Sequence, residues 1–146
     1  MEAVILVGVQ GAGKSTFYRE RFFDTHVRIN LDMLRTRKRE EQLLAACLYA
    51  GQSFVVDNTN PQAGDRVKYI APARARGFRV IGYFFDVPLR DAMQRNNQRK
   101  LRKKIPAVAV AGTHKKLEPP RKDEGFDQIF TVQVTEPAGF VVKEAA

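Results

Sequence analysis

The stretch GVQGAGKST, residues 8–16, directly follows the apolar run AVILV of residues 3–7. Its spacing fits G-x-x-x-x-G-K-[ST], in which glycines let the backbone turn tightly so that successive N–H groups point at phosphate oxygens. A helix that starts inside the pattern adds its own free N–H groups and its dipole. We therefore expect a loop built around a nucleoside triphosphate, contacted by these residues: Gly8, Gly11, Ala12, Gly13, Lys14, Ser15 and Thr16.

Two side chains of this loop carry the expected chemistry. Lys14 is placed to reach the β- and γ-phosphates, and the Ser15 hydroxyl is placed to ligate Mg²⁺. ATP and Mg²⁺ are thus the expected nucleotide and metal, although no motif that reads the base stands out and the residues alone leave GTP open. The alternative interpretation is an ordinary glycine-rich turn, which the preceding buried strand and the following helix make less favourable.

Around the loop, β-type runs and helical patterns alternate. The expected strands cover residues 4–9, 26–30, 54–57, 79–85 and 126–134. Five helices are expected. The first begins at Lys14 or Ser15, the second spans 33–50 and stops at Gly51, and the third has Asn60 as its cap and Pro61 as its first residue and ends at Gly77. The fourth begins at Pro88, and the fifth spans 106–117. The third of them has an expected apolar stripe of Ala63, Val67, Ile70 and Ala71. This alternation predicts an α/β fold, one domain over residues 1–146, with a mostly parallel sheet of about five strands flanked by helices.

The charge of the chain favours an anionic partner. The sequence has 25 Lys and Arg against 16 Asp and Glu, a net charge of +9. A basic surface concentrates phosphate-bearing ligands such as nucleic acid, although it also simply aids solubility. The single cysteine, Cys47, excludes an internal disulfide, and no apolar run approaches the ~20 residues of a membrane span. Without a signal peptide pattern, we expect a cytoplasmic protein with no membrane contact.

Two polar stretches follow expected strands. In INLDMLR, residues 29–35, Asp32 lies where a strand gives way to a helix, at the sheet edge where α/β folds bind ligands. It could accept the proton of an acceptor hydroxyl, and Arg35 could hold an acceptor phosphate; the alternative is that Asp32 only caps the helix. In FVVDNTNP, residues 54–61, Asp57 could hold Mg²⁺ or its water, or orient an arginine, whereas Asp and Asn are also common in plain turns.

A third stretch, QRNNQRK of residues 94–100, places Arg95 and Arg99 four positions apart, on one face of an expected helix. Arginines presented from a lid can close over donor phosphates and stabilise transferred charge. The basic region of about residues 95–112 is therefore an expected helical lid. The alternative is a solvated basic face, which is the commoner meaning of a charge run.

The order of these motifs resembles the 5′-kinase domain of the polynucleotide kinase family: the glycine loop, LDMLR, VVDNTN, QRNNQR and EGFDQI. The resemblance implies a P-loop kinase fold and transfer of the γ-phosphate of ATP to the 5′-hydroxyl of DNA or RNA. It implies that Asp32 is the general base, that Arg35 grips the adjoining phosphate, and that Asp57 and Asn58 support the acceptor site, with Asp57 orienting Arg35. It further implies that Lys14 and Arg99, with Arg95 beside it, contact the donor phosphates, and that nucleic acid 5′ ends are the partners.

Two other functions stay open on the residues alone. Small P-loop kinases with sugar or nucleoside acceptors share the glycine loop and an aspartate after the second strand. A non-catalytic nucleotide-binding module would leave Asp32, Arg35 and Arg99 as ordinary surface residues. The sequence does not reveal whether a separate ligase or phosphatase acts with the protein.

Overall fold

The computed structural model describes residues 1–100, 104–135 and 139–145. Its described strands form one sheet in the order β2-β3-β1-β4-β5-β6. Their bounds are Glu2–Val7 (β1), Val27–Ile29 (β2), Phe54–Val56 (β3), Arg79–Phe85 (β4), Gln128–Thr135 (β5) and Gly139–Glu144 (β6). The first five strands pair in parallel, and β6 pairs antiparallel with β5.

The α/β class and the parallel sheet are confirmed, but the expected five strands are six among the described residues. The sequence prediction missed β6, whose residues are half-buried or exposed and therefore lack a continuous apolar run. Its Phe140 nevertheless packs edge-on against Phe17 of helix α1, with ring centroids 5.1 Å apart. The extra strand thus covers apolar surface beside the phosphate-binding loop.

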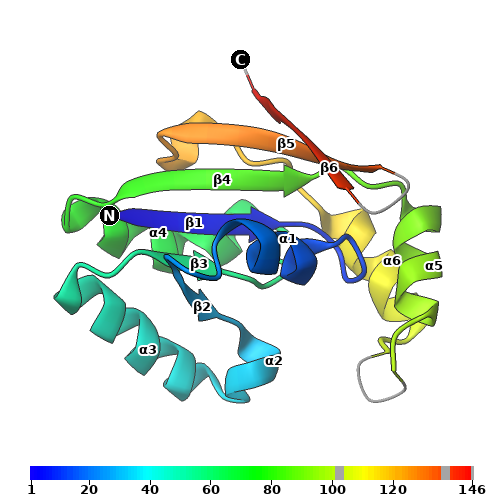
Figure 1. Ribbon diagram of the computed structural model, residues 1–146, viewed down its shortest axis with the longest axis horizontal. Helices are drawn as coiled ribbons and strands as arrows, with labels where there is room; N and C mark the ends of the chain where they lie inside the picture. The colour runs from blue at the N-terminus through cyan, green and yellow to red at the C-terminus, as the bar shows by residue number, and fades with distance from the viewer. Residues whose placement is uncertain (101–103, 136–138, 146) are drawn as a thin grey trace.

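Helices cover both faces of the sheet. Their bounds are Lys14–Arg21 (α1), Leu31–Leu34 (α2), Arg37–Ala50 (α3), Ala63–Ala75 (α4), Leu89–Asn97 (α5) and Ala107–Lys116 (α6). The core on one face includes residues of α3 and α4, and the core on the other includes residues of α1, α5 and α6. In Figure 1 the arrowheads of β1 and β4 point toward α5 and α6, so the loops after the strands gather at that edge. No helix in the described part of the chain is long and apolar enough to cross a membrane.

The expected single helix over residues 33–50 is wrong, because the chain forms α2 and then α3. The break lies at Arg35, which has a φ of 79° and therefore cannot continue a right-handed helix. Each helix has its own cap: Asn30 Oδ1 accepts the Met33 N–H at 2.9 Å, and Thr36 Oγ1 accepts the Arg39 N–H at 3.2 Å. Since Asn30 caps α2, Asp32 is not used as the cap and its carboxylate is left for other contacts.

The expected start of α4 is also wrong. Asn60 is not its cap: it is buried with a φ of 45°, and its Nδ2 donates to the Leu6 carbonyl at 2.9 Å. The helix begins at Ala63. The N–H of Gln62, the residue just before it, donates to Asp65 Oδ2 at 3.1 Å. Val67 of the expected stripe is 58% exposed, and the buried face instead consists of Arg66, Tyr69, Ile70 and Ala73. The predicted stop near Gly77 is confirmed, since the helix ends at Ala75.

Candidate active site

The loop of residues 8–13 holds Lys14 in a buried position. The Lys14 ammonium donates to the carbonyls of Gly8 at 2.9 Å and Val9 at 2.7 Å. Burial lowers the Lys14 pKa to about 8, an effect that the charges of Asp57 and Asp32 oppose and that of Arg99 reinforces. The loop is therefore already closed around its lysine, and a bound phosphate would take over hydrogen bonds that loop carbonyls now accept.

Glycine is required in this loop for packing as well as for phosphate contact. Gly11 has a φ of 80°, and a Cβ atom there would lie 2.4 Å from the carbonyl oxygen of Ala92 in α5. A Cβ atom at Gly8 would lie 2.9 Å from Cβ of Phe85, at the end of β4. The missing side chain at Gly8 lets the loop pack against Phe85, and the missing side chain at Gly11 lets it pack against the backbone of α5.

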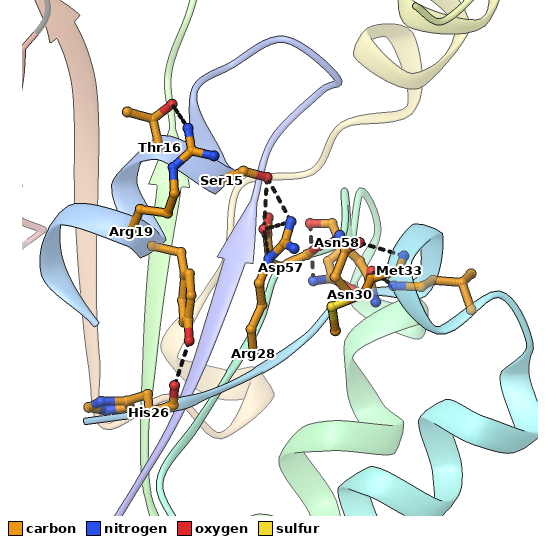
Figure 2. Close-up of polar contacts among 12 residues, drawn as sticks. Ser15, Thr16, Arg19, His26, Arg28, Asn30, Met33, Asp57 and Asn58 are labelled. Carbon is orange, nitrogen blue, oxygen red and sulfur yellow. Dashed lines mark hydrogen bonds and ion pairs between the residues drawn. The ribbon is translucent and has the colours of Figure 1, made fainter. Parts of the chain in front are cut away.

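Ser15, Asp57 and Arg28 form a closed polar contact at the start of α1 (Figure 2). Asp57 Oδ2 accepts the Ser15 hydroxyl at 2.9 Å and Arg28 Nε at 2.9 Å, while Arg28 Nη2 donates to Ser15 Oγ at 3.0 Å. The carboxylate is only 2% exposed. The resemblance implied that Asp57 orients Arg35; this is wrong, because the arginine on Asp57 is Arg28.

Arg28 is a site residue that the sequence analysis missed. It is the middle residue of β2, between Val27 and Ile29. A charged side chain inside a three-residue strand that is otherwise apolar was the available signal. Its contact partner follows the neighbouring strand β3, which pairs with β2 in parallel register, so only the sheet order brings the two together.

The stretch Asp57–Asn60 connects the loop to α2. Asn58 Oδ1 accepts the Leu31 N–H at 2.9 Å, and the Thr59 carbonyl accepts the Gly8 N–H at 3.0 Å. Asn58 Nδ2 donates to the buried carboxylate of Glu40 at 2.9 Å. Asn58, predicted to support the acceptor site, thus holds the first residue of the helix that carries Asp32.

These residues surround one cavity of about 440 Å³ at the carboxyl edge of the sheet. Lys14, Ser15, Asp57 and Asn58 line it together with Asp32 and Arg99, so the structure brings most of the predicted residues to one place. Arg35 is exposed and is not among the lining residues, whereas Arg37 is. Lys68 and Tyr69 of α4 and Lys116 of α6 complete the cationic and aromatic part of the wall.

The predicted lid arginines do not share one helix. Helix α5 ends at Asn97, so Arg95 lies in it and Arg99 lies in the bend beyond. The bend follows from Asn96, a buried side chain that accepts the Ile105 N–H at 3.0 Å and donates to the Ile105 carbonyl at 2.5 Å. Arg95 Nη1 is buried, and no residue in the described ranges accepts a hydrogen bond from it. Residues 101–103 of the expected lid region 95–112 lie outside the described residues.

Helix α6, part of the region expected to form a lid, contacts the loop of residues 8–13. Gln10 Nε2 donates to Thr113 Oγ1 at 3.3 Å, which links the loop to α6 directly. Thr16, expected to contact the nucleotide, accepts a hydrogen bond from Arg19 Nη2 at 3.3 Å on the surface of α1. Ala12 is fully buried, so its part in an anion site is limited to its backbone N–H, which donates to the Val9 carbonyl at 3.2 Å.

The residues present are compatible with Mg²⁺. The Ser15 hydroxyl and the Asp57 carboxylate are oxygen ligands of the kind Mg²⁺ prefers, with substrate phosphates and water supplying the rest of an octahedron. Within the described ranges, no cluster of three or more His, Cys, Asp or Glu residues could hold a metal by itself. A metal here would therefore be bound jointly with the nucleotide.

Known proteins match the chain over most of its length. A family model described as AAA domain covers residues 4–120. Proteins of Acanthamoeba polyphaga mimivirus and Schizosaccharomyces pombe, whose names both contain "bifunctional polynucleotide phosphatase/kinase", are 29% and 26% identical over 138 and 144 residues. Each match covers 90% of this chain and 33% of the relative, so the chain spans about a third of their length.

A gluconokinase from Sinorhizobium meliloti 1021 has the same fold. Its structure superimposes with a TM-score of 0.65 at 19% identity, over 93% of this chain and 84% of the gluconokinase. The predicted likeness to polynucleotide kinases is confirmed by the names of the curated relatives, and the predicted fold by this structure. The chain therefore has the P-loop kinase fold and belongs to the AAA domain family.

Proposed function

We propose that this P-loop kinase is a polynucleotide 5′-hydroxyl kinase that transfers the γ-phosphate of ATP to the 5′ end of DNA or RNA. The observation that carries the proposal is the position of Asp32. It lines the same cavity as Lys14 and Ser15, is exposed, and leaves the capping of α2 to Asn30. The names of the curated relatives and the net charge of +9 support a nucleic acid acceptor.

In the proposed reaction, the acceptor oxygen attacks the γ-phosphorus in line while the bond to the β,γ-bridging oxygen breaks and ADP leaves. Asp32 accepts the proton of the attacking hydroxyl. Lys14 and Arg99, which line the cavity near each other, stabilise the negative charge on the transferred group. Mg²⁺, held by Ser15 with Asp57 behind it, would neutralise charge on the β- and γ-oxygens when bound.

A second candidate function is a kinase for a small metabolite such as a sugar or nucleoside. The likeness to a gluconokinase favours it, as does the cavity of about 440 Å³, which is the size of a small-molecule site. Such an enzyme needs the same base and donor site. It does not need the cationic residues that line the rest of the wall.

The deciding experiment measures transfer from γ-labelled ATP with Mg²⁺ to two oligonucleotides, one with a 5′-hydroxyl and one already 5′-phosphorylated. We expect label on the first only, and loss of that label in Asp32→Asn. We also expect oligonucleotide affinity to fall steeply with salt, because binding releases counterions. Label on neither oligonucleotide, together with transfer to a sugar or nucleoside, would replace the proposal with the metabolite kinase.

A further inference from the structure

A buried carboxylate, Glu40 of α3, lies directly behind the part of the cavity wall that Asn58, Tyr69, Arg37 and Lys68 form. It is 2% exposed, and it accepts the Tyr69 hydroxyl at 3.0 Å and Asn58 Nδ2 at 2.9 Å. Burial and then the charge of Glu40 raise the pKa of Tyr69 to about 12, so the phenol remains a neutral donor at physiological pH. Glu40 is thus a fixed acceptor with a defined orientation.

Two cations reach this carboxylate from different helices. Arg37 Nη1 of α3 lies 2.9 Å from Glu40 Oε1, and Lys68 Nζ of α4 lies 3.8 Å from the same atom. Since both nitrogens approach one oxygen, they are close enough to share a single phosphate group. Both side chains line the cavity and remain 57% and 46% exposed, so each has N–H groups that face solvent.

This pair is separate from the donor site. The charges in the described structure that shift the pKa of Lys14 are those of Asp57, Arg99 and Asp32. Arg37 instead interacts with Glu40 and Tyr69. The cavity therefore has cations at two places: Arg37 and Lys68 lie on Glu40, and Arg28 lies on Asp57, which also accepts the Ser15 hydroxyl next to Lys14.

The cationic excess along the wall is unusual for a small neutral acceptor. Five cations and three carboxylates of the described residues line the cavity: Lys14, Arg37, Lys68, Arg99 and Lys116 against Asp32, Asp57 and Asp65. Asp57 is paired with Arg28. Asp65, which lies one turn before Lys68 in α4, accepts the N–H of Gln62. Arg37 and Lys68 share the single Glu40 carboxylate beneath the lining, so two cations against one carboxylate leave positive charge at this place for a phosphate.

We propose that Arg37 and Lys68 bind an internal phosphate of the acceptor strand, beyond the phosphate that adjoins the 5′-hydroxyl. The inference rests on the proposed function and makes it more specific, because such a site prefers an acceptor of more than one nucleotide. Glu40 holds the two cations side by side from below. Nucleoside 3′-monophosphates, which lack the second phosphate, would not use the pair.

The test compares Arg37→Ala, Lys68→Ala and their double variant with a matched control, Arg79→Ala/Lys143→Ala. The control removes the same charge from exposed positions outside the cavity lining, and Arg79 lies at the amino end of β4. Binding of a fluorescent 5′-hydroxyl oligonucleotide is measured by anisotropy without ATP, at several salt concentrations. Phosphate transfer is measured separately to the oligonucleotide and to a nucleoside 3′-monophosphate.

We expect each single substitution to weaken oligonucleotide binding about tenfold at low salt and to reduce the slope of log Kd against log salt by about one. Arg37→Lys should restore part of the loss, and KM for the nucleoside 3′-monophosphate should stay unchanged. Equal losses for both acceptors, or oligonucleotide affinity equal to that of the control, would overturn the inference.

The same measurements separate the two proposals. Oligonucleotide binding that depends on Arg37 and Lys68 but is not followed by transfer would keep the site and remove the kinase function. Transfer to the oligonucleotide that is indifferent to both residues would keep the function and remove the site. A wild-type protein that neither binds nor phosphorylates oligonucleotides would overturn both.

Discussion

The two ends of the cavity are built differently. At the donor end, Lys14 and Asp57 are buried and their polar atoms already have partners within the protein. At the end proposed to bind the acceptor, Asp32 is exposed and its helix α2 is held by Asn58, which accepts the Leu31 N–H; Arg35 is exposed just beyond α2, outside the cavity lining. The fold thus preforms the loop proposed to bind the nucleotide, while the groups proposed to bind the acceptor are held by backbone contacts and have exposed side chains.

The largest expected effect concerns the acceptor end. Asp32→Asn removes the proposed base while keeping the size of the side chain, so kcat should fall by about 10²- to 10⁴-fold. ATP affinity at pH 7 should change by less than about twofold, since Asp32 is only one of three charges that act on Lys14. Single-turnover transfer and calorimetric ATP titration measure the two quantities. Normal turnover would show that Asp32 is not the base, and that the acceptor end does not supply the proton acceptor while the donor end binds the nucleotide.

The donor end makes a prediction about pH. With a Lys14 pKa of about 8 in the nucleotide-free protein, the ammonium loses its proton as pH rises above that value. Bound phosphates favour the charged form, so nucleotide binding above pH 8 should take up a proton and weaken by up to about tenfold per pH unit. Titration calorimetry in buffers of different ionisation enthalpy measures the uptake.

The same pKa predicts how stability depends on pH. The unfolded lysine keeps its proton up to about its ordinary pKa of 10.5, whereas the folded one loses it near 8. Between these values the unfolded state binds more protons, so this group makes the free energy of unfolding rise with pH in that window. In Lys14→Met both effects should vanish; a proton uptake that persists in this variant would assign it to another group.

The sequence also predicted the two ends of the cavity unequally. The loop of residues 8–13 was predicted, because Gly8, Gly11 and Gly13 lie within six consecutive residues and favour a tight turn; its contacts to a nucleotide stay a prediction. Arg28 was missed because its contact to Asp57 exists only through the pairing of β2 with β3. The resemblance paired Asp57 with Arg35, whereas the structure pairs it with Arg28, since the order of motifs along a chain does not give side-chain partners.

The fold shows a similar limit. Strands with continuous apolar runs were found, and the half-exposed β6 was not. The helix break at Arg35 was missed because arginine favours helices, whereas here the Thr36 side chain accepts the Arg39 N–H and a new helix starts directly after the break. The end of α5 before Arg99 depends on the buried Asn96, whose partner Ile105 lies nine residues further along the chain.

A smaller effect is expected when the donor end is broken at Arg28. Arg28→Ala leaves the buried Asp57 carboxylate with the Ser15 hydroxyl as its side-chain partner, which should lower the free energy of unfolding by about 1–3 kcal/mol. Arg28→Lys should recover part of this loss, because an ammonium can reach one of the two contacts. Denaturant unfolding measures both, and exposed Arg79→Ala should stay within about 0.5 kcal/mol of wild type. An unchanged stability in Arg28→Ala would mean that the donor end is less rigidly built than its contacts indicate.

The smallest expected effect lies at Arg35, where the acceptor end carries backbone strain. A φ of 79° costs a non-glycine residue about 1–2 kcal/mol, whereas glycine adopts it freely but loses about 0.5–1 kcal/mol through its more flexible unfolded chain. Arg35→Gly should therefore be more stable than Arg35→Ala by about 0.5–1 kcal/mol. Both variants remove the guanidinium, so both should raise the acceptor KM alike while kcat is retained. Denaturant unfolding and steady-state kinetics on the same preparations separate the two properties. If the two variants were equally stable, or if Arg35→Gly restored acceptor affinity, the strained backbone would not be what positions Arg35. The acceptor end would then take its geometry from the bound substrate alone.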